Sequence, residues 1–167
     1  PRARRLLVRL VLSEGNGENL TQARRLLLGG PDLSAEDAEL LVESYRRQAN
    51  NPARLALAEE ASQQVIDKFH TSARLHNERG VLLVAQQRWG EGEASFVEAL
   101  RLDPALFDAW MNLGALRIDA RRATDAAQAY EAALRLRRDD YDAHLGLALA
   151  LRLRGMAPQE PPQRSLL

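Results

Sequence analysis

Three histidines and 23 acidic residues are the side chains of this 167-residue chain that could bind a metal or transfer protons, since it has no cysteine. Either chemistry needs several such groups converging on one point. Asp142 lies two residues before His144, and residues two apart on a helix do not face each other. His76 and His144 instead occupy equivalent positions of a repeat. The sequence therefore predicts structural roles for these histidines, no metal site and no catalytic residue.

The sequence also lacks the short motifs of common enzymes. It has no H-E-x-x-H, no phosphate-binding loop, no G-x-S-x-G and no dinucleotide fingerprint. The triplet Gly15-Asn16-Gly17 follows no predicted strand and leads into no lysine-bearing loop, so it is predicted to be a turn. We therefore predict a protein that is not an enzyme and needs no cofactor.

Composition narrows the partners that this chain could bind. Basic and acidic residues balance at 23 each, whereas a general nucleic-acid binder would carry a basic excess, so no nucleic acid is expected. No stretch approaches the roughly 18 apolar residues that span a bilayer, so direct membrane insertion is not expected. Lys68 is the one lysine of the sequence, and this arginine bias favours a GC-rich bacterial genome. Localisation stays open between the bacterial cytoplasm and the periplasm.

A fixed spacing, thirty-four positions long, recurs in the second half of the chain and is called the repeat period below. Apolar residues there follow helical periodicity, with short breaks and no sustained strand-like alternation. The pairs that share the spacing are Gly80 and Gly114, Phe96 and Tyr130, Ala99 and Ala133, Leu100 and Leu134, and Leu102 and Leu136. A fixed period of this length predicts stacked helical hairpins that share a core and present a long surface.

Turn and cap residues divide the chain into a series of predicted helices. Asn50-Asn51-Pro52 is one of the turns, Thr124 is a predicted N-cap, and Ser34 and Asp37 have the spacing of a capping box. Gly155 is expected to end the last helix. The predicted helices cover about 2–13, 18–28, the segment from the Ser34 cap to 48, 52–69, 73–86, 90–102, 107–119, 124–136 and 142–154.

These residues resemble the tetratricopeptide repeat family, whose 34-residue helix-turn-helix pattern runs W-x2-L-G-x2-Y, then A-x3-F, then P. The repeat that starts at 107 supplies Trp110, Leu113, Gly114, Ala126, Tyr130 and Ala133. The repeat that starts at 73 supplies Gly80, Gly92, Phe96, Ala99 and Pro104, with His76 and Arg79 in the tryptophan and leucine positions. A third start at 141 gives His144, Leu147, Ala148 and Leu151 and then runs out.

The resemblance implies an all-α, right-handed α-solenoid. Upstream of 73 the match decays, since Arg46 stands where a glycine is expected. The implied divisions are two degenerate helical-hairpin repeats over 1–72, full repeats at 73–106 and 107–140, a half repeat or capping helix at 141–155, and a flexible, proline-containing tail at 156–167.

Small residues in this pattern let the two helices of a unit approach closely. Gly80, Gly114 and Ala148 are predicted to share one such contact, with Phe96 and Tyr130 filling the space between units. Trp110 is expected to be buried in this packing. If it is, replacing Trp110 with alanine should cost on the order of 3–5 kcal/mol of stability.

The resemblance also implies a concave groove lined by the first helix of each repeat. The residues that it implies are Asn77, Val81, Val84, Asp108, Met111, Asn112, Ala115, Ile118, Leu145 and Leu149. An apolar floor with acidic residues at its rim suits an apolar helix or an extended peptide with basic flanks. Capture of a terminal carboxylate is not expected, because the positions where that subtype needs mainly basic groups hold Asn77, Val81, Asp142 and Gly146. Leu149 and Leu153 could instead face a capping helix or a second copy of the chain.

The predicted function is a protein–protein interaction scaffold that binds a partner helix or peptide. Such repeats commonly occur in bacterial envelope, motility or secretion assemblies. The alternative is a regulatory arm cut from a larger multidomain enzyme, because the chain begins at Pro1 without a methionine and its last predicted helix has no partner helix. The same two features predict that this chain is part of a longer protein. A homo-oligomer through the C-terminal repeat end is a further possibility.

Overall fold

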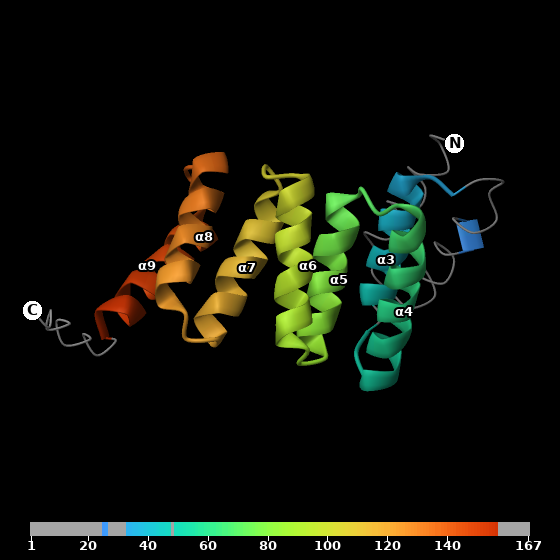
Figure 1. The fold of residues 1–167 in the computed structure, drawn as a ribbon, viewed down its shortest axis with the longest axis horizontal. Coiled ribbons are helices and arrows are strands. Elements are labelled where there is room, and N and C mark those ends of the chain that lie inside the picture. The colour runs from blue at the N-terminus through green and yellow to red at the C-terminus, as the bar shows by residue number, and fades with distance from the viewer. Residues whose placement is uncertain (1–24, 27–32, 48, 157–167) are drawn as a thin grey trace, which may run out of the picture. The chain divides into compact units, whose positions relative to one another are not determined.

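The computed structural model describes residues 25–26, 33–47 and 49–156, and every regular element in these ranges is helical (Figure 1). The seven helices are α3 (Ala35–Arg47), α4 (Pro52–Lys68), α5 (Ala73–Ala85), α6 (Trp89–Leu102), α7 (Phe107–Asp119), α8 (Ala123–Leu136) and α9 (Tyr141–Met156). Their ends lie within about two residues of the predicted ones. The helices predicted at 2–13 and 18–28 lie outside the described residues, apart from 25–26.

Local capping explains where the first of these helices begin. At α3 the Asp37 amide donates to Ser34 Oγ at 3.2 Å and the Ser34 amide to the Asp37 carboxylate at 3.4 Å, which confirms the capping box. Asn51 caps α4 by accepting from the Arg54 amide, and Pro52 occupies the first turn. Ser72 caps α5 in the same manner.

The predicted cap at Thr124 is wrong. Helix α8 begins at Ala123, so Thr124 lies inside it, and Arg122 takes the N-cap position without a side-chain cap bond. The reason is the preceding turn, in which Arg121 has a φ of 60° and the Arg122 amide donates to the Arg117 carbonyl at 2.8 Å. This is the Schellman arrangement, and it starts the next helix at once. Gly155 likewise does not end α9, which continues to Met156.

The turn between α5 and α6 shows this geometry one repeat period earlier. Gln87 has a φ of 61°, and the Arg88 amide donates to the Leu83 carbonyl at 2.9 Å. Arg88 then holds Glu91 in the first turn of α6, as Arg122 holds Asp125 in α8. Both hairpins therefore turn through a non-glycine residue in the left-handed region.

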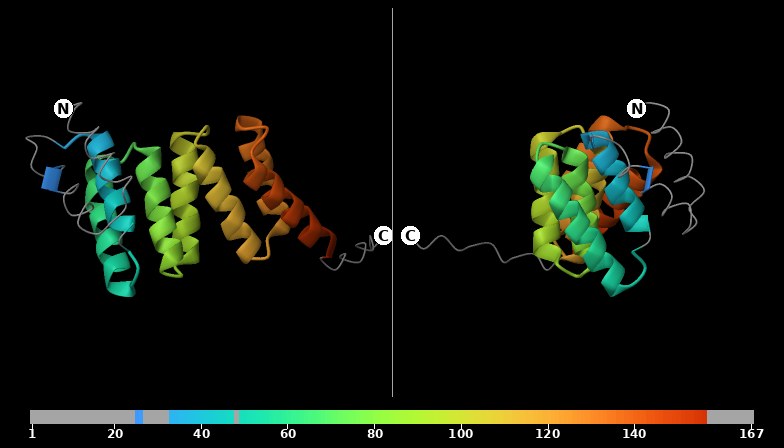
Figure 2. Two further views of the ribbon diagram at one scale, coloured as in Figure 1. Left: turned by 180° about the vertical axis from the view of Figure 1, so that it is seen from behind. Right: turned by 90° about the vertical axis from the view of Figure 1, so that its right-hand side faces the viewer.

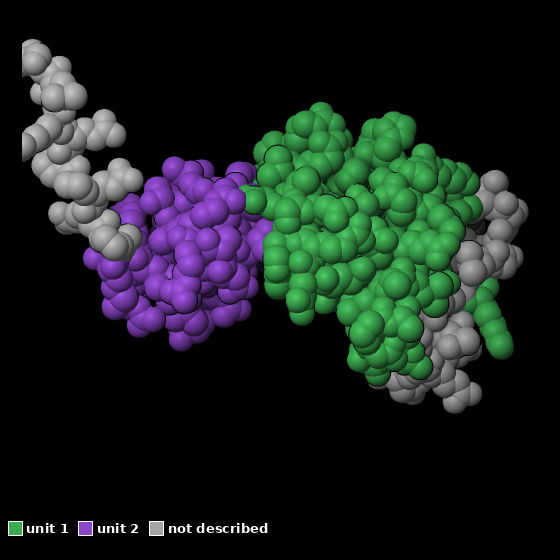
Figure 3. Space-filling model, turned by 60° about the horizontal axis from the view of Figure 1, so that its bottom comes forward, with its two compact units in different colours: residues 1–109 green, residues 110–167 purple. Residues whose placement is uncertain are grey.

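The chain divides into two compact units, 1–109 and 110–167, and the boundary falls inside α7 (Figure 3). In the first unit α3, α4, α5 and α6 pack as neighbouring antiparallel helices (Figure 2). Its core contains Ala38, Val42, Ala58, Leu75 and Leu82 among others. In the second unit α8 packs on α9 around Ala126, Ala127, Tyr130 and Ala150.

The hairpins α5–α6 and α7–α8 each bring a glycine of the first helix against an aromatic ring of the second. A Cβ added to Gly80 would lie 2.5 Å from Phe96 Cε1, and one added to Gly114 would lie 2.8 Å from Tyr130 Cζ. Both contacts confirm the predicted close approach. Ala148 does not join them as predicted, because it is exposed on α9. A different residue, Gly146, meets the Tyr130 ring there, with a distance of 2.4 Å from its added Cβ to Cε1.

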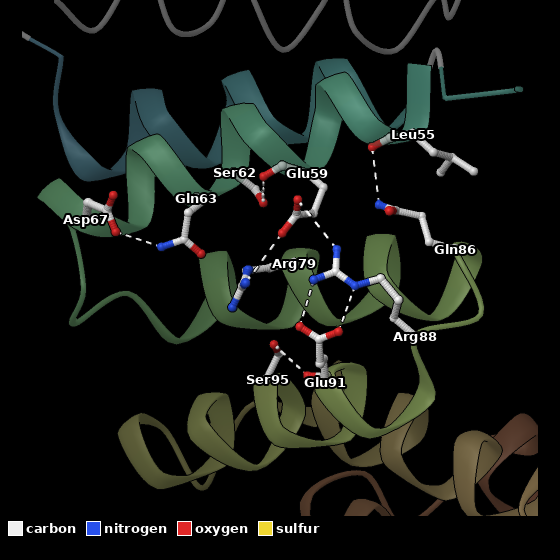
Figure 4. A network of polar contacts seen from close by, with 10 residues as sticks. All are labelled: Leu55, Glu59, Ser62, Gln63, Asp67, Arg79, Gln86, Arg88, Glu91 and Ser95. Carbon is white, nitrogen blue, oxygen red and sulfur yellow. Dashed lines mark hydrogen bonds and ion pairs between the residues drawn. The ribbon is translucent and has the colours of Figure 1, made fainter. Parts of the chain in front are cut away.

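Two arginines at apolar or glycine positions of the repeat are compensated by carboxylates. Arg79 Nη2 lies 3.4 Å from Glu59 Oε1 of α4, and Glu59 Oε2 lies 3.7 Å from Arg88 Nη1 (Figure 4). Arg46 of α3 forms an ion pair with Glu78 of α5. At these two positions the repeat pattern has leucine and glycine. Here ion pairs connect the helices instead.

Trp110 is only partly buried, contrary to expectation. Its replacement with alanine should therefore cost less than the roughly 3–5 kcal/mol expected for a buried tryptophan, because part of its apolar area stays in water in the folded chain.

Gly80→Ala should lower the free energy of unfolding by about 1–3 kcal/mol, because the added Cβ overlaps the buried Phe96 ring. The matched control is Gly90→Ala on α6, where an added Cβ meets nothing within 4 Å. It should leave stability unchanged or raise it by up to about 1 kcal/mol. Urea titrations followed by circular dichroism measure both. Equal effects of the two changes would contradict the close approach.

Gln87→Gly should raise the free energy of unfolding by about 0.5–1.5 kcal/mol, since glycine adopts a φ of 61° without the Cβ penalty. Gln64→Gly, at an exposed position inside α4, should instead lower it by about 1 kcal/mol. The same titration serves for both, and a destabilised Gln87→Gly variant would show that this turn is not strained.

Candidate functional site

The first unit contains a cleft of about 110 Å³ between its first helices. α3 and α5 form its walls, and the segment entering α7 closes one side. The lining residues are Glu36, Glu39, Leu40 and Glu43 from α3, Arg74, Asn77 and Glu78 from α5, and Leu106 and Asp108 next to or within the first turn of α7. Three of these, Leu40, Arg74 and Asp108, are separated by one repeat period each, so equivalent positions of successive repeat units meet here.

Carboxylates dominate the charge of this cleft. Five of its lining residues are glutamate or aspartate, and Arg74 is the one cation among them. Leu40 and Leu106 are buried beneath them and give the floor an apolar part. Charges of one sign in a cleft with low-dielectric walls raise the local concentration of the opposite charge. Two of the five carboxylates are paired with arginines outside the lining: Arg46 pairs with Glu78, and Arg47 Nη2 lies 2.6 Å from Glu43 Oε1.

Glu78 is the most perturbed carboxyl of the cleft. Burial raises its pKa above the ordinary value of 4.5, and the negative charges of Glu43 and Asp108 act in the same direction. The ion pair with Arg46 lowers the pKa but does not offset the burial. Loss of the Glu78 proton is therefore less favourable in the folded chain than for an ordinary glutamate in water.

Hydrogen bonding holds the wall of the cleft in place. Ser72 Oγ donates to Glu39 Oε1 at 2.7 Å, and the same hydroxyl accepts from the Leu75 amide at the start of α5. Glu39 also borders a second hollow of about 550 Å³, which shares Glu36 and Arg74 with the first. The two hollows thus form a longer depression along α3 and α5.

The structure brings two of the predicted groove residues into this cleft, Asn77 and Asp108. Val84 is placed differently, because a Cβ on Gly92 of α6 would lie 2.7 Å from Val84 Cγ2. Val81 is partly buried on the same helix. The binding role of these residues stays a prediction.

The other predicted groove residues belong to the second unit. Met111 and Ile118 pack against its apolar cluster, and Asn112 is partly buried. Ala115 and Leu145 are exposed, and Leu149 is partly buried. Their binding role also stays a prediction.

Sequence reasoning missed the contribution of α3. Its lining residues Glu36, Glu39, Leu40 and Glu43 follow the i, i+3, i+4, i+7 spacing of one helix face. Leu40 and Glu43 also precede Arg74 and Asn77 by one repeat period. Both signals were readable in the sequence, but the weak repeat pattern upstream of residue 73 obscured them.

The histidines lie apart from this cleft and fill structural positions. His76 Nε2 donates to the His70 carbonyl at 3.0 Å, and His144 Nε2 donates to the Arg138 carbonyl at 2.8 Å. The bond of His144 is equivalent to that of His76, two repeat periods further along the chain. Over 33–47 and 49–156, no group of three or more histidine, aspartate or glutamate side chains is placed to hold a metal ion. None of the helices in these ranges has the length and apolar character needed to cross a membrane.

Repeated antiparallel hairpins with a cleft on their first helices define an all-α helical-repeat solenoid. The fold is that of tetratricopeptide-repeat structures. It is similar to the crystal structure of the MamA protein, with a TM-score of 0.72 and 17% identity over 93% of this chain and 82% of that chain.

Two peptide-bound or partner-bound structures are also similar. The first repeat domain of Spaghetti (RPAP3), bound to the HSP90 peptide SRMEEVD, has a TM-score of 0.66 and 17% identity over 72% of this chain and 95% of that chain. The TPR2B domain of yeast Sti1 in its pHsp70 complex has a TM-score of 0.62 and 19% identity over 73% and 97%. No protein-family model and no curated protein matches the sequence. The likeness is therefore one of fold.

Glu78→Gln should change the pH dependence of stability. Between 4.5 and the raised native pKa, the unfolded chain has released the Glu78 proton while the folded chain still binds it, so stability falls as pH rises through this window. Glutamine does not titrate, so the variant's free energy of unfolding should gain on that of the parent as pH rises from about 4 to about 7. The attraction of Arg46 acts on the ionised form of Glu78 and is already included in its native pKa.

Urea titrations at several pH values measure this difference. Glu131→Gln, which removes an exposed carboxylate of α8, controls for the loss of one negative charge. A flat or opposite trend for Glu78→Gln would contradict the raised pKa.

Proposed function

We propose that this chain is a non-enzymatic scaffold that binds a segment of a partner protein in the cleft of α3 and α5. The occupant is an extended peptide or helix that carries arginine or lysine next to apolar side chains. One observation carries this proposal: five carboxylates from three successive first helices converge over buried Leu40 and Leu106, with Arg74 as the one lining cation.

The similar structures support the choice of a protein segment as ligand. The repeat domain of Spaghetti holds a peptide whose sequence, SRMEEVD, ends in a mostly acidic run. The cleft described here favours a positively charged segment, because its acidic lining residues would repel an acidic peptide. Fold and electrostatics together favour a basic segment in this position.

The residues predicted in the second unit remain a separate candidate surface. Met111, Asn112, Ala115, Ile118, Leu145 and Leu149 belong to it. A role in a bacterial envelope, motility or secretion assembly, and the alternative of a regulatory arm of a larger enzyme, rest on the sequence predictions. Binding of a basic partner segment is compatible with both.

Selection from a library of random short peptides tests the proposed ligand class. Peptides enriched on the full chain should carry net positive charge, and their affinity should fall with added salt, because screening weakens the attraction. Glu39→Gln combined with Glu43→Gln should weaken the selected peptides about tenfold in fluorescence anisotropy, from two partly exposed charge contacts.

The matched control is Glu131→Gln combined with Asp139→Asn, which removes two exposed charges of the second unit. It should leave affinity within about twofold of the parent. The peptide SRMEEVD serves as an acidic probe and should not bind. Enrichment of acidic or neutral peptides, or equal losses in the two double variants, would overturn the proposal.

A further inference from the structure

Arginines of the chain itself already pair with carboxylates of the cleft of α3 and α5. Arg46 of α3 forms an ion pair with Glu78 of α5, and Arg47 pairs with Glu43 within α3. The pair of Arg47 joins two partly exposed side chains four residues apart on one helix, a type that contributes little. The pair of Arg46 is different, because it connects the two walls of the cleft and involves the most perturbed carboxyl there.

The Arg46 guanidinium reaches Glu78 from outside the lining of the cleft. Its Nε donates to Glu78 Oε2, and within the described residues the other oxygen, Oε1, accepts no hydrogen bond. Glu78 itself lines the cleft. A cation that enters the cleft and approaches Glu78 therefore meets a carboxylate whose charge is already balanced. It also comes close to the Arg46 guanidinium, which repels it because both are positive.

The repeat pattern does not require this ion pair. Arg46 precedes Gly80 by one repeat period, and Glu78 precedes Asn112 by the same interval. Both of the later residues are uncharged, and Gly80 admits the Phe96 ring in place of a charged contact. The opposite charges at 46 and 78 are therefore particular to the part of the chain that forms the cleft.

We propose that Arg46 is an internal competitor of the ligand: its guanidinium neutralises Glu78 and so lowers the affinity of the cleft for a basic segment. This inference rests on the proposed function, because it concerns the same cleft and the same class of ligand. Arg46 has the chemistry expected of that ligand, a planar cation on an apolar stem. An entering segment gains only from the negative charge that Arg46 leaves uncompensated.

Removal of the Arg46 charge should have opposite effects on the free chain and on the complex. The free chain loses stability, because Glu78 is left as a partly buried charge without its partner. A basic segment then supplies the missing positive charge, so the same change strengthens binding. The variant Arg46→Met removes the guanidinium and keeps most of the apolar stem.

Fluorescence anisotropy with basic peptides selected on the parent chain measures the change in binding. Their affinity for Arg46→Met should be about three- to tenfold higher than for the parent at about pH 8.5. An alkaline pH is needed because loss of Arg46 raises the pKa of Glu78 further, and a protonated Glu78 attracts no cation. In thermal denaturation the variant should melt below the parent without peptide, and saturating peptide should raise its melting temperature more than that of the parent.

Two matched variants separate this effect from a general change in net charge. Arg135→Met removes an exposed arginine of α8 in the second unit and should change the affinity by less than about twofold. Arg46→Lys keeps the positive charge and should bind as the parent does. Circular dichroism checks that each variant is folded, and Arg46→Gln, which retains a hydrogen-bond donor for Glu78, provides the same test if Arg46→Met is not. An equal gain in Arg135→Met overturns the inference.

Parallel peptide selections on the parent and on Arg46→Met distinguish this inference from the proposed function. If basic peptides bind the parent but bind Arg46→Met equally or more weakly, the inference fails and the proposed function stands. If basic peptides bind only Arg46→Met, the inference is supported, and Arg46 blocks the cleft of the parent. If neither chain selects basic peptides, both the inference and the proposed function fail.

Discussion

Close approach of a glycine to an aromatic ring is the contact on which the hairpins α5–α6 and α7–α8 depend. Gly80 admits Phe96, and Gly114 admits Tyr130, at separations that no side chain at the glycine would allow. Because the ring comes from the second helix and the glycine from the first, this contact sets the spacing of each hairpin. In the first unit, side chains of α3 and α5 meet around a shared cleft.

Local signals predicted the helices well, and non-local ones were harder to read. Asn51-Pro52 and Ser72 act within a few residues, so the starts of α4 and α5 could be predicted from sequence. The cap at Thr124 was wrong because the preceding turn, with Arg121 in the left-handed region, sets where α8 starts. Ala148 was misplaced because it is exposed on α9, where Gly146 meets the Tyr130 ring instead.

The candidate site was predicted in part for the same reason. Asn77 and Asp108, which the family resemblance implied for a groove, line the cleft, whereas α3 departs from the repeat pattern and its glutamates were not recognised. That departure has a structural counterpart. Arg46 replaces the expected glycine and pairs with Glu78, which itself lines the cleft. Glu78 therefore contributes both to the packing of α3 on α5 and to the charge of the cleft. The sequence pattern alone does not identify either role.

Tyr130 has a consequence for how the end of the chain unfolds. Its ring lies between Gly114 of α7 and Gly146 of α9, so one side chain of α8 forms part of two interfaces. In a stack of repeats, stability is the sum of terms within units and terms between neighbours. The Tyr130 ring contributes both to the packing within its hairpin and to the packing on α9, so losing one of these contacts also weakens the other. We therefore expect the last three described helices, α7, α8 and α9, to unfold together.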